Sequence, residues 1–299
     1  MISVIVCTYN REKYIYECLS RLAANKCSVD WEIVLINNNS TDNTASECER
    51  FEKNCNPNNY RYFVEKRQGL SFARNRGIQE AKGEWLVFLD DDAFVEEDYI
   101  ENLNKNLKYY PAIGAFGGKI VPFFEEETPD WLNPWSLSFV SALDKGNKVC
   151  EFDNKKRGYP IGANMGIARK AIEKCGNFNT DLGRNGSGIL LGGEEKDIFN
   201  RIREAGFPIM YFPDIAVRHC IPSHRTTREF IAKIGYGVGV SEKLRTKHLG
   251  KSAYLKRLIA ECVKWGGTIA LWLGYLCMRQ PQKGNILIVF RSNVTRGLI

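Results

Sequence analysis

The chain has 299 residues, of which 44% are hydrophobic and 26% are charged, and its formal net charge is +7. This length allows one or two domains with a substantial core, and the composition is typical of a soluble globular protein. The ten cysteines are scattered without a Cys-x-x-Cys pair, which argues against a zinc ribbon and favours reduced thiols in a cytoplasmic protein. No basic or long apolar segment precedes the first apolar run, so we expect no secretory signal.

The first 120 residues alternate strand-like and helix-like segments. Apolar runs typical of strands occur at Ile2–Val6, Glu32–Ile36, Tyr60–Val64, Trp85–Leu89 and Ile113–Phe116. Amphipathic segments typical of helices occur at Glu12–Ala24, Asp42–Lys53 and Ser71–Lys82. This alternation predicts βαβ units, and therefore an α/β fold with a mostly parallel sheet and helices on both faces.

The periodicity weakens over residues 121–159, where proline, tryptophan and glycine accumulate. A long irregular stretch of this kind is typical of a lid or a binding loop. Trp131 and Trp135 lie in it, and their rings are suited either to stacking on an acceptor or to packing alone. Regular segments then return, and are listed in chain order as Pro160–Arg169, a helix at Glu194–Ala205, short strands at Pro208–Phe212 and Ile215–Arg218, and helices to the end.

The C-terminal part of the chain is strongly basic. Residues 243–299 contain eleven Lys or Arg and one acid, Glu261, so they carry +10 and the first 242 residues carry −3. An anionic partner is expected, and charge alone allows membrane lipid or nucleic acid. The uncharged stretch Trp265–Met278 has fourteen residues, which is shorter than the ~20 needed to span a bilayer. It predicts either an interfacial helix or a helix packed on the rest of the protein. We interpret Gly235, Gly237 and Gly239 as helix-packing or loop glycines.

Polar side chains follow three of the expected strands, in Cys7–Arg11, Asn37–Asp42 and Asp90–Asp92. Because ligands bind beyond the carboxyl ends of parallel strands, we expect the three clusters to converge on one cleft. The first cluster lacks the Gly-x-Gly-x-x-Gly pattern, which argues against a nicotinamide-type dinucleotide site.

Three adjacent carboxylates, Asp90, Asp91 and Asp92, end the fourth apolar run. They would repel one another unless a cation lay between them, and hard cations such as Mg²⁺ take oxygen ligands. Alternation along an extended chain points Asp90 and Asp92 to one side and Asp91 to the other. The alternative is that these acids begin a helix near Glu96 and complement its dipole.

These motifs resemble those of glycosyltransferase family 2, and they occur in that family's order. The matching segments are VIVCTYNRE, EIVLINNNSTDNT, GLSFARNRGIQEAKGEWLVFLDDDA, GANMGIARKAIEKCGNF and GGEEKDIFNRIREAG. The resemblance covers roughly residues 1–220 and implies the GT-A fold. It also implies an inverting, hexosyltransferase-type enzyme that moves a sugar from a nucleotide-diphosphate donor to an acceptor hydroxyl. We expect a catalytic domain at 1–222, with a nucleotide-sugar-binding half at 1–120 and an acceptor-binding half at 121–222, followed by a helical, basic region at 223–299.

The resemblance also implies a set of donor-binding residues, namely Thr8, Tyr9, Asn10, Arg11, Asn38, Arg74, Asn75, Asp90 and Asp91. Asn38 stands where many members have an aspartate that bonds the base, so the nucleotide stays open. Arg74 suits a phosphate contact, and its alternative is an ion pair on a helix surface.

For the chemistry, the resemblance implies that Asp92, Asp90 and His219 hold Mg²⁺ or Mn²⁺, while a structural role for His219 is the alternative. An inverting transfer needs a base for the acceptor hydroxyl, and the family pattern assigns it to Glu195, with Glu194 as rival. The alternative for these acids is to complement the dipole of a helix start. Asn164 joins Trp131 and Trp135 as expected acceptor-binding residues.

The resemblance favours a role in surface polysaccharide or lipid-linked glycan biosynthesis, in the cytoplasm or peripherally on the inner face of the membrane, without nucleic acid as partner. Two other functions are alternatives. A sugar nucleotidyltransferase would need a basic, glycine-rich phosphate loop after the first strand, where only Arg11 and Lys13 are available. A non-catalytic sugar- or nucleic-acid-binding module on the same fold would leave the repulsion among the three aspartates unexplained.

Overall fold

A computed structural model describes residues 1–153, 158–186 and 188–299. They form two compact units. Unit 1 comprises Met1–Phe123, Ala142–Thr180 and Glu194–Cys220, and unit 2 comprises Phe124–Ser141, Asp181–Gly193 and Ile221–Ile299. The predicted boundary between a catalytic domain at 1–222 and a helical region at 223–299 stays a prediction.

Unit 1 is built on a sheet whose strands run in the order β3-β2-β1-β4-β8-β6-β9-β5, and β7 pairs with β9. The strands are β1 (Ile2–Thr8), β2 (Trp31–Asn37), β3 (Tyr60–Val64), β4 (Trp85–Asp90), β5 (Ala93–Val95), β6 (Ala115–Phe124), β7 (Cys150–Glu151), β8 (Asn164–Ala168) and β9 (Ile209–Ile221). β1 to β4 pair in parallel, as predicted. β8 is antiparallel to both β4 and β6, and β5 is antiparallel to β9. The predicted α/β class is therefore confirmed, with its parallel strands in the N-terminal half.

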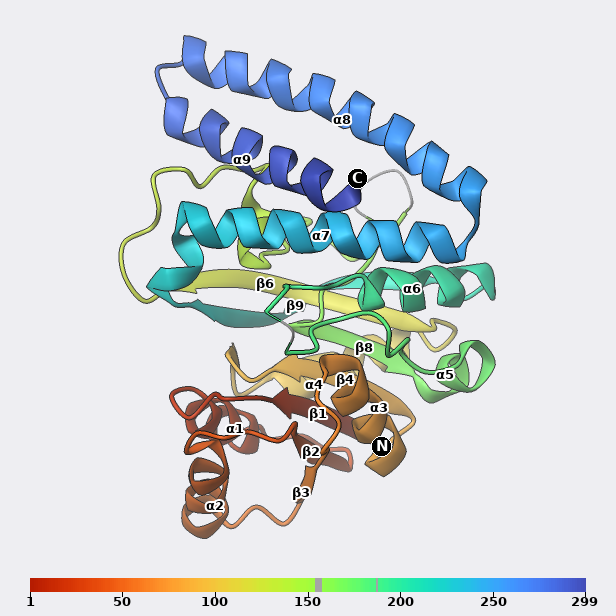
Figure 1. The fold of residues 1–299 in the computed structure, drawn as a ribbon. Coiled ribbons are helices and arrows are strands. Elements are labelled where there is room, and N and C mark those ends of the chain that lie inside the picture. Colours follow the sequence, from red (N-terminus) through yellow and green to blue (C-terminus); the bar gives the residue numbers. More distant parts are fainter. Residues whose placement is uncertain (154–157, 187) are drawn as a thin grey trace. The chain divides into compact units, whose positions relative to one another are not determined.

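Helices connect the parallel strands where the sequence predicts them. They are α1 (Ile15–Ala23), α2 (Thr44–Cys55) and α3 (Leu70–Glu80). The helices α4 (Tyr99–Tyr109), α5 (Arg169–Cys175) and α6 (Glu194–Glu204) follow β4 along the chain. Figure 1 shows α1 and α2 on one side of β1, β2 and β3, and α3 on the other side. This is the arrangement that right-handed βαβ connections produce.

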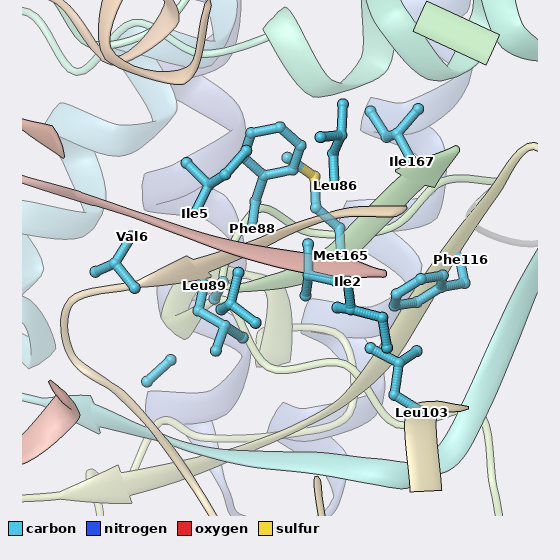
Figure 2. Packing of buried hydrophobic residues seen from close by; sticks show 14 of the residues in the cluster. Ile2, Ile5, Val6, Leu86, Phe88, Leu89, Leu103, Phe116, Met165 and Ile167 are labelled. Atoms are coloured by element: carbon cyan, nitrogen blue, oxygen red, sulfur yellow. The ribbon is translucent and has the colours of Figure 1, made fainter. Parts of the chain in front are cut away.

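The core of unit 1 lies around β1 and β4, which are covered on both faces. Val4, Ile5 and Val6 are fully buried, and alternate side chains of these strands reach opposite faces of the sheet. Figure 2 shows Ile5 beside Phe88, with Met165 of β8 and Phe116 of β6 farther along the sheet. α3 approaches β1 closely because Gly77 has no Cβ, which would collide with Ile5. The site at the ends of these strands therefore rests on a densely packed base.

One prediction about the strands is wrong. The short strands expected at Pro208–Phe212 and Ile215–Arg218 are a single strand, β9. The Pro213–Asp214 pair between them looks like a turn in sequence, but the Asp214 carboxylate accepts hydrogen bonds from the Asn106 side-chain amide at 2.8 and 2.9 Å. This partner accommodates the polar side chain without a break in the strand.

Unit 2 contains three long helices, α7 (Arg228–His248), α8 (Lys251–Cys277) and α9 (Pro281–Leu298), and two short 3-10 helices, η1 (Leu137–Val140) and η2 (Ser223–Thr226). A Cβ at Gly235 would meet the Phe290 carbonyl of α9, and one at Gly239 would meet the Val294 carbonyl. These glycines therefore let α7 and α9 approach closely, which agrees with their interpretation as helix-packing glycines. Within the described part of the chain, no helix is both long enough and apolar enough to cross a membrane.

Candidate active site

The three polar clusters predicted to converge do meet at one edge of the sheet in unit 1. Cys7 of β1 is paired with Asp90 of β4, and Thr8 is paired with Asn37 of β2. Beyond these ends, the Thr8 carbonyl accepts a hydrogen bond from the Asn38 backbone N–H at 2.8 Å. The parallel register of β1, β2 and β4 therefore determines the position of the candidate site.

Asp90, Asp92 and His219 form a cluster suited to a divalent cation. One ligand atom from each lies within 4.8 Å of the others. His219 is brought there by the antiparallel pairing of β5 and β9, in which Ala93 is opposite His219. Its Nε2 lies 3.0 Å from Asp92 Oδ1, and both side chains are 2% exposed. Two carboxylates and an imidazole are donors that Mn²⁺ and Mg²⁺ accept, so the residues fit such an ion.

Asp91 faces a different partner, Arg11. The Arg11 guanidinium donates from Nε to Asp91 Oδ1 at 3.1 Å, and its Nη2 lies 3.6 Å from Asp92 Oδ2. Burial raises the pKa of Asp91 to about 7, although the nearby positive charge of Arg11 opposes the shift. The structure thus separates Asp91 from the Asp90–Asp92 pair, and it places Arg11 against the carboxylates.

A second charged cluster joins α3 to the start of α6. The Arg74 side chain is 3% exposed, and it donates to Glu194 Oε1 at 3.0 Å and to Glu195 Oε1 at 3.3 Å. Glu194 is 5% exposed, whereas Glu195 keeps 23% of its side chain exposed. Of the two acids, Glu195 is therefore the one with more surface to offer a substrate.

Glu195 has the electrostatic properties of a base that works near neutral pH. Burial raises the pKa of Glu195 to about 7, and the negative charges of Glu194 and Asp90 add to the rise, while Arg74 opposes it. The influence of Asp90 on both Glu195 and Arg74 indicates that the two clusters share one electrostatic environment. A carboxyl group with such a pKa is suited to take up a proton in a reaction.

Gly162 was missed by the sequence reasoning. Its backbone N–H donates to Glu195 Oε1 at 2.9 Å, and a Cβ at this position would collide with Arg74 Nη2 and Glu195 Oε1. Only a glycine allows the backbone to come this close. The available signal was its place directly before Ala163-Asn164 in the GAN segment of the family resemblance.

Several expected donor-binding residues are held by the protein itself. The Asn75 side chain donates to the Phe178 carbonyl and accepts from the Phe178 N–H, both at 2.9 Å. Arg74 is committed to the two glutamates rather than to a helix-surface ion pair. Tyr9 is 42% exposed, and Asn10 adopts φ +53° with its side-chain oxygen accepting from the Thr41 N–H at 2.8 Å.

Asn38 organises the loop before α3. Its amide nitrogen donates to the carbonyls of Glu65 and Arg67 at 3.0 and 2.8 Å, and its oxygen accepts from the Gly69 N–H at 2.8 Å. An aspartate could accept from Gly69 but would repel the two carbonyls. The amide is therefore required by the conformation of residues 65–69, next to the predicted nucleotide site.

The expected acceptor residues have different environments. Asn164 in unit 1 is fully buried, and its side chain bonds to Tyr99, Lys119 and Ile215, so it has no surface to offer an acceptor. In unit 2, the Trp131 indole N–H donates to the Thr226 carbonyl at 2.9 Å, whereas the Trp135 side chain is 61% exposed.

Comparisons with known proteins support the resemblance. A family model described as "Glycosyl transferase family 2" matches residues 3–176. The glucosyl-dolichyl phosphate glucuronosyltransferase of Haloferax volcanii is 23% identical over 272 residues, which cover 86% of this chain and 83% of that protein. The succinoglycan biosynthesis protein ExoM of Rhizobium meliloti is 26% identical over 234 residues, covering 78% and 71% of the two chains. Three further relatives are matched over only 16%, 29% and 35% of their length.

Among solved structures, the mannosyltransferase PcManGT from Pyrobaculum calidifontis in complex with GDP-Man and Mn²⁺ superposes with a TM-score of 0.63. The sequence identity is 19%, and the match covers 97% of this chain and 86% of that chain. This similarity shows that the two proteins share a fold, as the resemblance implies.

Proposed function

The chain belongs to glycosyltransferase family 2 and is a glycosyltransferase, and on that premise we propose that it moves a sugar from a nucleotide-diphosphate donor to an acceptor hydroxyl with inversion at the anomeric carbon. The observation that carries this proposal is the pairing of two charged clusters in one environment. One, at Asp90, Asp92 and His219, suits a cation, and the other places Glu195 as a base.

The first cluster would bind the diphosphate end of the donor through a divalent cation. Asp90, Asp92 and His219 would hold Mg²⁺ or Mn²⁺, which when bound supplies positive charge against the leaving nucleotide diphosphate. Mn²⁺ is the natural first probe because the PcManGT structure contains it with a nucleotide sugar. Arg11 lies beside the same carboxylates, and its guanidinium is suited to a phosphate oxygen of the donor.

Glu195 acts as the base for the acceptor hydroxyl. Its 23% exposed side chain can reach a substrate, and its pKa near 7 allows it to be deprotonated before the reaction and protonated after it. Glu194 is nearly buried and bonded to Arg74, so its role is to hold that guanidinium. Arg74 and the Gly162 N–H in turn orient the Glu195 carboxylate toward one position.

The remaining donor contacts come from the loop residues after β1 and β2. Thr8 ends β1, Tyr9 and Asn10 follow it, and Asn38 holds the segment 65–69. Because Asn38 is committed to that segment, the base of the nucleotide is read by other groups of these loops.

For the acceptor, we propose a growing surface polysaccharide or a lipid-linked glycan, in the cytoplasm. The names of two relatives support this class, one being a glucosyl-dolichyl phosphate glucuronosyltransferase and the other a succinoglycan biosynthesis protein. The exposed Trp135 offers an aromatic face for such an acceptor. Contact with an anionic membrane surface is a separate proposal, argued in the next subsection.

The test is a panel of sugar nucleotides incubated with the full chain and Mn²⁺, with release of the nucleotide diphosphate as the readout. One donor should be hydrolysed slowly, and release should stop with EDTA and in Asp92→Asn. Glu195→Gln should abolish transfer to an acceptor while leaving nucleotide binding intact. NMR of the anomeric proton in the transfer product reports the configuration. Retention of configuration, or full transfer by Glu195→Gln, would contradict the proposed mechanism.

A further inference from the structure

α8 presents two different faces within unit 2. The helix has 27 residues and is therefore about 40 Å long. Its buried residues Arg257, Glu261, Thr268 and Tyr275 recur at helical spacing and form one face. Arg257 and Glu261 of this face bond to α7 and α9, for example through Arg257 Nε to Glu242 Oε2 at 3.1 Å. α8 is thus oriented in its bundle by a buried polar network.

The opposite face of α8 is exposed and apolar. It is called the α8 outer face and consists of Leu255, Ile259, Val263, Ile269, Leu273 and Leu276. These side chains are between 39% and 74% exposed, with Val263 at the upper limit. The smaller exposed residues between them, Cys262, Gly266, Ala270 and Cys277, add no charge. The face extends about 32 Å along the helix. Soluble proteins normally expose apolar side chains singly, so an apolar face of this length indicates an interaction surface.

Residues 243–299, which include α8, carry no exposed acid. Residues 243–299 contain a single acidic side chain, Glu261, which is 3% exposed and bonds to Arg257 at 2.7 Å and to Arg291 at 3.1 Å. By contrast, Lys251, Lys256 and Lys264 on α8 are exposed. The buried network therefore neutralises the single acid of residues 243–299, and exposed lysines lie on the same helix as the α8 outer face.

We propose that the α8 outer face lies on the surface of an anionic phospholipid bilayer, with its apolar side chains at the boundary between headgroups and acyl chains. Such a surface takes up apolar side chains and attracts lysines at the same time. A second copy of the chain on this face would bring lysines against lysines, with no exposed acid of residues 243–299 to pair them. A nucleic acid would need basic residues on the contact face itself, where this face is apolar. The inference stands apart from the transfer chemistry, because it concerns unit 2 alone.

The first test compares binding of the full chain to two kinds of vesicle, phosphatidylcholine alone and phosphatidylcholine with about one-third phosphatidylglycerol. The triple variant Ile259→Glu, Val263→Glu, Leu273→Glu changes exposed positions only. Because burial of each such side chain favours binding by about tenfold or more, its partition onto anionic vesicles should fall at least about 100-fold. The matched control is Val64→Glu, Tyr109→Glu, Val121→Glu, which adds the same charge at exposed positions of unit 1 and should bind much more tightly than the triple variant on α8.

Lysine variants separate the charge contribution from the apolar one. Replacing Lys251 and Lys256 with Gln should weaken binding to anionic vesicles by about fivefold per lysine and leave binding to phosphatidylcholine unchanged. Thermal unfolding of every variant in the absence of lipid shows whether the fold is intact.

A second readout adds no charge to the α8 outer face. Cys262 and Cys277 lie on the exposed side of α8, and Cys55 is exposed in unit 1. A polarity-sensitive fluorophore on Cys262, with the other exposed cysteines changed to Ser, should shift to shorter wavelength on anionic vesicles, and the same fluorophore on Cys55 should not. Equal shifts at the two positions, or vesicle binding undiminished in the triple Glu variant, would overturn the proposal. Dimers that dissociate in that variant, without vesicle binding by the unaltered chain, would instead identify a self-interface and overturn it too.

Discussion

The Arg74→Met substitution should lower the free energy of unfolding far more than a substitution on a helix that covers the sheet usually does. The guanidinium is 3% exposed and bonded to both glutamates, so the substitution leaves Glu194, itself 5% exposed, without its charge partner. Removing one partner of a buried ion pair costs about 3–5 kcal/mol. The matched control is Arg76→Met, two residues along α3. Arg76 bonds to Glu80 at 2.8 Å with 33% and 20% of the two side chains exposed, and such a pair contributes about 0.3–0.5 kcal/mol.

The cost of Arg74→Met should also depend on pH, and the sign follows from the carboxyl groups. Arg74 lowers the pKa of Glu195, which burial has already raised to about 7, so the substitution raises that pKa further. A carboxyl group whose pKa is raised in the folded state binds its proton more tightly there, so the destabilisation is largest above the folded pKa and shrinks as pH falls through it. Guanidinium-induced unfolding at about pH 8 and about pH 6 should therefore give a smaller difference from the unaltered chain at the lower pH. The reasoning is refuted if Arg74→Met costs no more than Arg76→Met, or if its cost is the same at both pH values.

Three further outcomes are expected. The rate of transfer by the unaltered enzyme should rise with pH through about 7 and then level, because Glu195 must lose its proton to act as base; a flat profile of kcat/KM against pH would contradict this assignment. Asp92→Asn and His219→Ala should each weaken Mn²⁺ binding by at least about tenfold in EPR titrations, whereas Asp98→Asn, at an exposed acid of the α4 N-terminus, should leave it unchanged. Asn38→Asp should destabilise unit 1 by about 1–3 kcal/mol, because the carboxylate would face the Glu65 and Arg67 carbonyls without a donor; thermal unfolding unchanged from that of Asn38→Ser would speak against this role.

The fold of unit 1 was predictable in its N-terminal half because local patterns determine it. Apolar runs separated by amphipathic segments allow essentially one parallel arrangement, and β1 to β4 adopt it. The GT-A fold implied by the resemblance is confirmed by the similarity to PcManGT. The strand β9 was divided wrongly because Pro213 and Asp214 are turn-forming by type, and the Asn106 amide that accommodates Asp214 is more than a hundred positions away in sequence.

The candidate site was predictable in its residues but not in their partners. Alternation along an extended chain correctly separates Asp91 from Asp90 and Asp92. No local pattern indicates that Arg74 pairs with Glu194, which is 120 positions away, or that Asn75 pairs with the backbone of Phe178. These contacts depend on tertiary packing, and they support a role for Arg74 in positioning the proposed base, beside the phosphate contact that stays a prediction.

The two charged clusters together support the proposal that the site binds a cation with the donor. Four carboxyl groups lie in them, at Asp90, Asp92, Glu194 and Glu195, and the Asp91 carboxyl lies next to the first cluster. Among the described residues, the guanidinium groups of Arg11 and Arg74 pair with these acids, so the acids outnumber the guanidinium groups paired with them. Burial raises the pKa of Asp91 and of Glu195 to about 7, which lessens the excess of negative charge without removing it. A nucleotide diphosphate brought to this edge of the sheet would be repelled by the chain's own acids. The proposed donor would therefore need accompanying positive charge, and Asp90, Asp92 and His219 are the groups that could hold it as a divalent cation.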